Sequence, residues 1–370
     1  MMYDPYKALY IHIPFCKKRC AYCDFATEAR ACDDPAIERY VDDLILEIRR
    51  ASREEKLGHI ETVYIGGGTP SHIGLKNLSK LLYTLSTSMH LTPEVECSME
   101  ANPESLTEAM VKDIWALGVN RLSLGVQSFD DEVLKSLGRV HDAETAKRAI
   151  EIAKTRFENV SVDLMCGTPG QDFDGFDRDL RTAIDAGVTH VSVYPLTIEE
   201  NTLLESLVDT GVLEAPVEDT QALMMQTAVR ALEPAGYNRY EVASYAKPGF
   251  ECRHNIAYWT GKPYIGFGTS AVTMTQNDSR RMRVQDGQVI DDLDRAQMCA
   301  EDLMLGMRMV QGISDTQVSD AALLLPQLVM TLRDLIHAGF VEHVDGRYRP
   351  TVMGWLCGNE LYGRIYDLAP

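Results

Sequence analysis

YIHIPFCKKRCAYCDF, residues 10–25, starts as an apolar strand pattern and ends in three closely spaced cysteines. The cysteines, Cys16, Cys20 and Cys23, have the spacing C-x3-C-x2-C. Three thiolates so close in sequence can face one metal centre only when the loop between them wraps around it. A strand that leads directly into such a loop would deliver it to the mouth of a barrel. This stretch therefore decides both the architecture that we expect and the place of the site.

The number of cysteines in the motif narrows the type of metal site. A closed structural zinc site takes four protein ligands, whereas three leave one position open. An iron–sulfur cluster held by three cysteines has one iron free to bind a further molecule. The alternatives are a zinc site completed by His12, Asp24 or Cys32, and a loop that holds no metal. We expect Cys32, Cys166 and Cys252 to be structural.

Outward from the motif, the first 200 residues alternate between short apolar runs and helical patterns. The clearest helix has Asp34 as its N-cap and Pro35 in its first turn. The runs are rich in Val and Ile, as parallel strands buried on both faces are. Six successive βα units predict an α/β fold, a partial parallel (β/α)6 TIM-like barrel with its chemistry at the carboxyl ends of the strands. The six expected strands are residues 8–15, 61–65, 94–99, 121–126, 160–165 and 190–196.

The regular alternation of apolar runs and helical patterns ends after residue 200. A helix near 218–232 precedes a strand-like segment, 239–245, and a long helical pattern covers 293–310. The last 55 residues suggest two helices, a hairpin around Asp345-Gly346 and a final helix, which is the layout of a small α+β, winged-helix-like domain. We therefore expect a core barrel over 1–200, an extension of the barrel over 201–290 and a winged-helix-like C-terminal domain over 291–370.

Composition excludes several classes of protein. The chain of 370 residues is 45% hydrophobic and 25% charged, which is typical of a globular protein and not of a disordered one. With 55 acidic and 36 basic side chains its net charge is −19, which argues against binding to nucleic acid or to an anionic membrane. We find neither an apolar run of about 18 residues nor a signal-peptide pattern, so no membrane anchor is expected and the predicted location is cytoplasmic.

The cysteine motif and the strand before it resemble the signature of radical S-adenosylmethionine (SAM) proteins, in particular the coproporphyrinogen-oxidase-like branch. The resemblance covers nearly the whole chain. It implies that Cys16, Cys20 and Cys23 hold a 4Fe–4S cluster whose fourth iron binds the methionyl group of SAM. One-electron reduction would then cleave SAM to methionine and a 5′-deoxyadenosyl radical.

Further segments match the family in order along the chain. YIGGGTPS includes Gly66, Gly67 and Gly68, and residues without a Cβ let a ligand approach the backbone closely. The resemblance implies contacts of Glu100 with the SAM ammonium, of Gln127 and Asp163 with the ribose, and of Arg139 with the carboxylate. The full set of residues that we expect at SAM is Tyr10, Tyr22, Gly67, Gly68, Thr69, Glu100, Gln127, Arg139, Asp163 and Val272. We also expect His12, on the preceding strand, to support the cluster. The other interpretation is a histidine that belongs to the strand without any role at the cluster.

Two functions from different classes fit this branch. One is an oxygen-independent coproporphyrinogen III dehydrogenase, which oxidatively decarboxylates two propionates. The other is a haem chaperone that keeps the radical SAM framework but binds haem and transfers it to acceptor proteins. The dehydrogenase motif has a fourth cysteine where this chain has Phe25, and its members carry a longer segment before the cluster. The segment CRHNIAYWTGKPYIGFGTSA contains an HNxxYW pattern that resembles the chaperone subgroup.

We therefore expect a haem chaperone, with the dehydrogenase as the alternative. His254, Tyr258 and Trp259 are the candidate haem residues, because a histidine can ligate iron and aromatic rings can stack on a porphyrin. A histidine buried in a core is the other interpretation of His254. The expected cofactors are the 4Fe–4S cluster and SAM, with haem as cargo. The expected partners are haem-acceptor proteins. No catalytic residue is assigned beyond this machinery, although SAM cleavage is expected.

Overall fold

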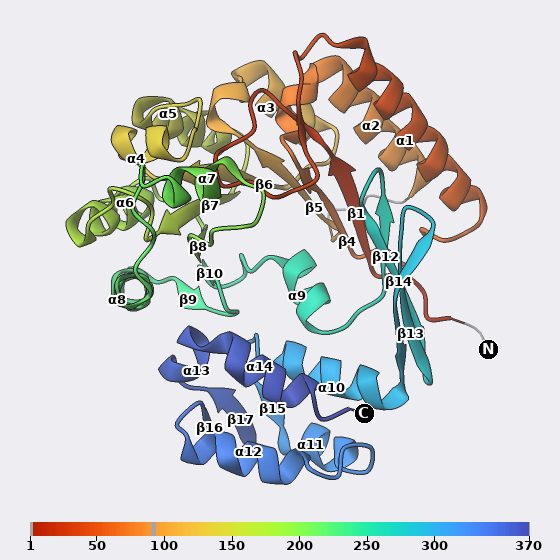
Figure 1. Ribbon diagram of the computed structural model, residues 1–370. Coiled ribbons are helices and arrows are strands. Elements are labelled where there is room, and N and C mark those ends of the chain that lie inside the picture. Colours follow the sequence, from red (N-terminus) through yellow and green to blue (C-terminus); the bar gives the residue numbers. More distant parts are fainter. Residues whose placement is uncertain (1–2, 90–93, 370) are drawn as a thin grey trace.

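The computed structural model describes residues 3–89 and 94–369 and is built around one twelve-stranded sheet with a smaller unit beneath it (Figure 1). The strands follow the order β14-β13-β12-β11-β1-β4-β5-β6-β7-β8-β10-β9. The six consecutive central strands are β1 (Ala8–Ile13), β4 (Thr62–Gly67), β5 (Glu96–Ala101), β6 (Arg121–Gln127), β7 (Asn159–Cys166) and β8 (His190–Pro195). Each pairs in parallel with the next. The sheet is open, with β14 and β9 at its edges.

These six strands are the six that the sequence predicts, with small shifts at their ends. They are buried on both faces because helices cover the outer side and the inner side faces the strands across the curved sheet. In β1, for example, Leu9, Ile11 and Ile13 are fully buried on one face, and Ala8 and His12 are buried on the other. This burial is the reason for the continuous apolar runs of the sequence. The predicted partial parallel barrel is thus confirmed.

Helices pack along the outside of the central strands (Figure 1). They are α1 (Pro35–Arg53), α2 (Gly74–Ser88), α3 (Glu108–Ala116), α5 (Ala143–Lys154), α6 (Phe173–Asp185) and α8 (Glu218–Leu232). The first begins where the sequence predicts: the Asp34 side chain accepts a hydrogen bond from the amide of Ala36, and Pro35 occupies the first turn. Its buried face includes Ile37, Val41 and Leu44.

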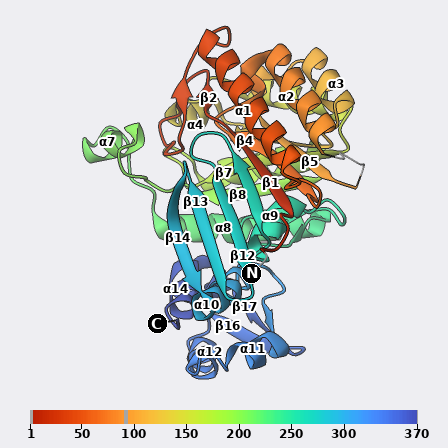
Figure 2. The same cartoon turned by 90° about the vertical axis from the view of Figure 1, so that its right-hand side faces the viewer.

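The sheet continues beyond β1 into a ribbon that the sequence does not reveal. β11 (Tyr264–Phe267) pairs in parallel with β1, and β12 (Val272–Asn277), β13 (Arg280–Gln285) and β14 (Gln288–Asp294) follow as an antiparallel ribbon. Figure 2 shows this ribbon reaching from the main sheet down to the smaller unit. The helix expected over 293–310 begins only at α10 (Arg295–Gly306), because Asp294 and Gln297 form a capping box. The strand-like 239–245 is two short strands, β9 (Asn238–Arg239) and β10 (Ser244–Ala246).

The smaller unit consists of short helices and a three-stranded sheet. After α10 its elements are β15 (Ile313–Ser314), α11 (Asp315–Ala321), α12 (Leu328–His337), β16 (Val341–Val344), β17 (Arg347–Pro350), α13 (Val352–Leu356) and α14 (Gly358–Tyr366). The hairpin predicted around Asp345-Gly346 connects β16 and β17. A hydrophobic cluster that runs from Ala300 to Ile365 fills this unit and is separate from the main core. The separate core favours the boundary expected near residue 290, and the domain limits stay predictions.

None of the helices in the described residues is long and apolar enough to span a membrane.

Candidate functional site

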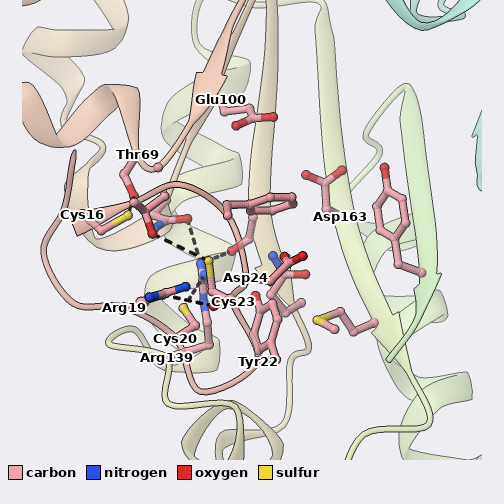
Figure 3. Close-up of a pocket in the computed structure, with 18 of the residues that line it drawn as sticks. Cys16, Arg19, Cys20, Tyr22, Cys23, Asp24, Thr69, Glu100, Arg139 and Asp163 are labelled. Atoms are coloured by element: carbon pink, nitrogen blue, oxygen red, sulfur yellow. Dashed lines mark hydrogen bonds between the residues drawn. The ribbon is translucent and has the colours of Figure 1, made fainter. Parts of the chain in front are cut away.

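A cavity of about 470 Å³ opens at the carboxyl ends of the central strands. Gly67 ends β4, Gln127 ends β6 and Pro195 ends β8, so the walls come from successive strands, as expected for this architecture. The cysteine loop forms one side of the cavity, and Glu100 and Asp163 point into it from β5 and β7 (Figure 3). The expected SAM residues that line it are Tyr22, Gly67, Gly68, Thr69, Glu100, Gln127, Arg139 and Asp163.

All three cysteines of the motif line this cavity. The loop that carries them starts in β2 (Phe15–Cys16), which pairs in parallel with β3 (Glu28–Ala29). The two ends of the loop therefore lie side by side. Inside the loop, the amide of Cys23 donates to the carbonyl oxygen of Cys20 at 3.3 Å, and the amide of Ala21 donates to the carbonyl oxygen of Leu137 at 3.0 Å. The cysteine loop is therefore held by a hydrogen bond within itself and by another to the segment that follows α4 (Asp131–Ser136).

Hydrogen-bonding groups surround the cysteine sulfurs. The hydroxyl of Thr69 donates to Cys16 Sγ at 3.5 Å, and Nη1 of Arg139 donates to Cys20 Sγ at 3.3 Å. Cys23 Sγ lies 3.8 Å from the hydroxyl of Thr27. Burial raises the pKa of the Cys16 thiol, and the hydrogen bond from Thr69 opposes that effect. Donors placed at sulfur favour a thiolate, which is the form that ligates metal.

Of the three alternative zinc ligands, Asp24 lines the cavity beside the cysteines, whereas His12 and Cys32 do not. Nowhere in the described chain do three or more His, Cys, Asp or Glu side chains converge closely enough to hold one metal ion. His12, an alternative zinc ligand, has its Nδ1 at 3.0 Å from the hydroxyl of Tyr10 and its Nε2 at 2.9 Å from the carbonyl oxygen of Ala26. Cys32 is exposed and does not line the cavity. Three cysteines at an open cavity therefore fit a cluster with one iron left open, and a zinc site completed by Asp24 stays the alternative.

The glycine loop lies against the start of the cysteine loop. Gly67 has a φ of +110°, which favours glycine. A Cβ on Gly68 would lie 2.9 Å from the carbonyl oxygens of Ile13 and Phe15, which are backbone atoms with no freedom to move aside. The amide of Gly68 also donates to the carbonyl oxygen of Ile13 at 2.7 Å. The absence of side chains here lets the ends of β1 and β4 touch and keeps the cavity open.

Glu100 is held in the cavity by two donors. The hydroxyl of Tyr64 donates to Oε1 at 2.8 Å, and the amide of Gly67 donates to Oε2 at 3.1 Å. Burial nevertheless raises the pKa of Glu100 to about 7, since these bonds and Arg121 offset only part of the desolvation. Burial likewise raises the pKa of Asp163, which accepts a hydrogen bond from Ser123. Two buried carboxyl groups with raised pKa values in one cavity are typical of a functional site.

Gln127 reaches the cavity because the end of β6 is irregular. The register with β7 shifts between Gly125 and Gln127. Gln127 itself has a φ of +70°, which is uncommon for a residue with a side chain. Such backbone strain is typical of binding sites.

Two expected SAM residues do not line the cavity. The ring of Tyr10 stacks on Tyr64 at 6.4 Å between centroids, and its hydroxyl is bonded to His12. Tyr10 therefore lies behind Tyr64, which itself bonds to Glu100. Val272 opens β12 and pairs with Gln285 on the ribbon. Their contacts with SAM stay predictions.

The cavity also contains residues that the sequence analysis missed. Asn102 follows the end of β5, and Tyr194 lies at the end of β8, followed by Thr197 and Glu199. Asn102, Thr197 and Glu199 come shortly after the predicted strands 94–99 and 190–196, and this position was the available signal, because barrel sites are built there. Tyr194 lies within the predicted strand and had no such signal.

The candidate haem residues lie on α9 (Arg253–Trp259), away from this cavity. His254 is 1% exposed, and its Nδ1 lies 2.9 Å from the hydroxyl of Thr62. Its ring stacks on Tyr64 at 5.1 Å and meets the edge of Tyr258 at 4.8 Å. Burial lowers the pKa of His254 to about 3, so the ring is neutral. Its Nε2 is buried and finds no hydrogen-bond partner in the described part of the chain.

Trp259, the third candidate, packs elsewhere. The guanidinium group of Arg308 lies over its ring at 5.0 Å and over the ring of Tyr362 at 4.6 Å. Both partners belong to the smaller unit, so Trp259 joins that unit to the barrel. The structure thus brings His254 and Tyr258 together and separates them from the contacts of Trp259.

Comparison with known proteins agrees with this geometry. The family description "Radical SAM superfamily" matches residues 10–183. The heme chaperone HemW of Bacillus subtilis (strain 168) is 31% identical over 374 residues, which cover 96% of this chain and 98% of that protein. The heme chaperone HemW of Escherichia coli (strain K12) is 38% identical over 72% of this chain and 70% of its own length. The structure of coproporphyrinogen III oxidase (HemN) from Escherichia coli superposes with a TM-score of 0.80 at 20% identity, covering 98% of this chain and 90% of that chain.

Proposed function

Because the chain belongs to the HemW heme chaperone family of the radical SAM superfamily, we propose that it binds haem and transfers it to acceptor proteins. In this proposal the barrel holds a 4Fe–4S cluster on Cys16, Cys20 and Cys23, and SAM in the cavity beside it. The observation that carries the proposal is the cysteine triad at the cavity, in a chain that matches a heme chaperone over almost its full length.

The roles proposed for the residues around SAM follow from their charge and from their position in the cavity. Glu100, whose ionised form is available near neutral pH, binds the ammonium group, and Gln127 and Asp163 bind the ribose. Arg139 has a buried Nε without a hydrogen-bond partner among the described residues, which leaves a donor for the carboxylate. Tyr22, Gly67, Gly68 and Thr69 form the surrounding walls, with Tyr10 and Val272 further out.

A cluster held by Cys16, Cys20 and Cys23 would supply one-electron chemistry and an open iron position for SAM. The residues of the chain bind and orient SAM. Arg139 and Thr69 hold two of the cysteine sulfurs, and the glycine loop gives the ligand access to the backbone. Their task is therefore binding and positioning, and no residue of the cavity is proposed to form a covalent bond with substrate.

The coproporphyrinogen dehydrogenase is the alternative, and the fold alone does not separate it from the chaperone. The observation against it is Phe25, which is 63% exposed and lines the cavity where the dehydrogenase motif has a cysteine. The test is an anaerobic incubation of the cluster-loaded protein with SAM, a strong reductant and coproporphyrinogen III. We expect 5′-deoxyadenosine without protoporphyrinogen. Formation of protoporphyrinogen would overturn the chaperone proposal.

SAM binding is expected to strengthen as the pH rises from 6 to 7. With a pKa of about 7, the ionised fraction of Glu100 increases from roughly a tenth to a half over this range. Only the ionised carboxylate attracts the ammonium group, so the affinity rises about fivefold. Glu100→Gln should bind SAM weakly at both pH values. Glu199→Gln, at another carboxyl group of the same cavity, should keep the rise. Equilibrium binding of SAM at the two pH values measures it, and an unchanged rise in Glu100→Gln would contradict the role of Glu100.

His254 is proposed as the haem ligand, through the Nε2 that lacks a partner. The ring is almost fully buried, so ligation requires α9 to move away from β4. His254→Ala is expected to weaken haem binding and to change the absorption spectrum of the bound iron, because a neutral imidazole is lost from the axial position. Asn255→Ala on the same helix is the control. An unchanged affinity and spectrum in His254→Ala would remove His254 from this role.

A further inference from the structure

A single side chain joins the groups that donate to two of the cysteine sulfurs. Asn102 Nδ2 donates to Thr69 Oγ1 at 3.0 Å, and Asn102 Oδ1 accepts from Nη2 of Arg139 at 2.8 Å. Thr69 and Arg139 in turn donate to the sulfurs of Cys16 and Cys20. The result is an unbroken hydrogen-bonded chain from one sulfur to the other, with Asn102 at its centre.

The position of Asn102 is fixed from several sides. It follows directly on β5, and its backbone amide donates to the hydroxyl of Ser71 at 3.3 Å. Gly125 leaves room for the amide group, since a Cβ there would lie 3.0 Å from Asn102 Oδ1 and 3.4 Å from Nη2 of Arg139. The same Nη2 also donates to the carbonyl oxygen of Gly125 at 2.5 Å. Arg139 is therefore held with its Nη1 beside Cys20.

The chemistry of the amide explains why an asparagine suits this place. Asparagine both donates and accepts, whereas aspartate at neutral pH only accepts. By donating to the oxygen of Thr69, the amide leaves the hydroxyl hydrogen of Thr69 to point at Cys16. By accepting from Arg139, it orients the planar guanidinium group so that Nη1 reaches Cys20.

We propose that Asn102 is a positioning residue that, through Thr69 and Arg139, raises the reduction potential of the cluster. The inference rests on the proposed cluster at Cys16, Cys20 and Cys23. Reduction by an external one-electron donor adds negative charge to the cluster and its sulfurs. Hydrogen bonds and a positive charge at those sulfurs stabilise the reduced form more than the oxidised one, and bonds to the sulfurs are known to set such potentials.

The test is a redox titration of the reconstituted cluster without SAM, followed by electron paramagnetic resonance. Asn102→Ala is expected to shift the equilibrium about tenfold against reduction, which is about 59 mV for a one-electron couple. Thr69→Val, which removes the donor to Cys16 alone, should shift it in the same direction by less. Thr69→Ser keeps the hydroxyl and should restore the wild-type potential.

Asn120→Ala is the matched control. Asn120 bonds to the backbone of Val95 and Cys97 at the opposite end of the same strand and has no contact with the cavity. A merely structural effect of losing an asparagine would appear in this variant as well, and we expect its potential to match the wild type.

The outcomes separate this inference from the proposed function. If the wild-type chain forms no cluster, the proposed function itself fails. If the cluster forms and its potential is the same in wild type, Asn102→Ala and Thr69→Val, the inference is wrong while the function stands. Should Asn102→Ala fail to fold or to load iron, the comparison of Thr69→Val with Thr69→Ser decides, and equal potentials in that pair would overturn the inference.

Discussion

Alanine in place of Cys20 is expected to abolish the iron–sulfur cluster. With only Cys16 and Cys23 left, the cluster loses one of its three protein ligands, and the described residues offer no fourth cysteine at the cavity to replace it. Anaerobic reconstitution followed by absorption and iron analysis measures the effect. The spectrum of Cys20→Ala should fall to that of the chain without added iron.

Cys32→Ala is the control for this experiment, because Cys32 is exposed and lies outside the cavity. It should load as much iron as the wild type. The fold itself should survive the loss of Cys20, since its side chain is only half-buried and belongs to none of the hydrophobic clusters. A complete cluster in Cys20→Ala, or its loss in Cys32→Ala, would show that the ligands are assigned wrongly.

Gly68→Ala is expected to have the second largest effect. The new Cβ would press on the backbone at Ile13 and Phe15, next to the first cysteine. Forcing a methyl group into such a space typically costs about 1–3 kcal/mol. If this strain falls on the binding loop, the affinity for SAM drops roughly ten- to hundredfold, at about 1.4 kcal/mol for each factor of ten.

Gly58→Ala is the matched control, because no atom lies within 4 Å of a Cβ at that position. It should bind SAM as the wild type does. Equilibrium binding of SAM to the three cluster-loaded proteins makes the comparison, with thermal unfolding to follow stability. Equal affinity in Gly68→Ala and wild type would mean that this loop does not shape the SAM site.

The sequence reveals the barrel well because its strands are buried on both faces. Six apolar runs separated by helical patterns leave few alternatives, and the caps at Asp34 and Pro35 mark a helix start directly. The ribbon of β12, β13 and β14 cannot be predicted in this way. β12 is rich in polar residues, and β13 and β14 carry arginines and aspartates that pair across the ribbon, such as Arg280 with Asp292 and Arg283 with Asp291. These strands therefore form no apolar run in the sequence.

The residues of the site also differ in whether the sequence predicts their position. Residues at the carboxyl ends of strands, such as Glu100 and Gln127, reach the cavity because the architecture places these ends together. Tyr10 lies within its strand. Its contacts depend on the side chain beside it on the neighbouring strand, which is Tyr64. No pattern along the chain shows that His254 and Trp259, five residues apart, meet different parts of the molecule.

The hydrogen bonds among Asn102, Thr69 and Arg139 are equally invisible in the sequence. They join the segments that follow β4 and β5 to Arg139, which follows α4, and only the folded chain brings these groups to the cysteine sulfurs. A sequence motif identifies ligands by their spacing, whereas the groups that support those ligands come from across the barrel.

The central claim is that a radical SAM barrel carries haem for delivery. An anaerobic titration of the cluster-loaded protein with haem tests it most directly, with subsequent transfer to a haem-free globin followed by absorption. We expect saturable binding at one haem per chain and passage of that haem to the globin. Haem uptake that does not saturate, or that matches the uptake of an unrelated acidic protein, would contradict the claim.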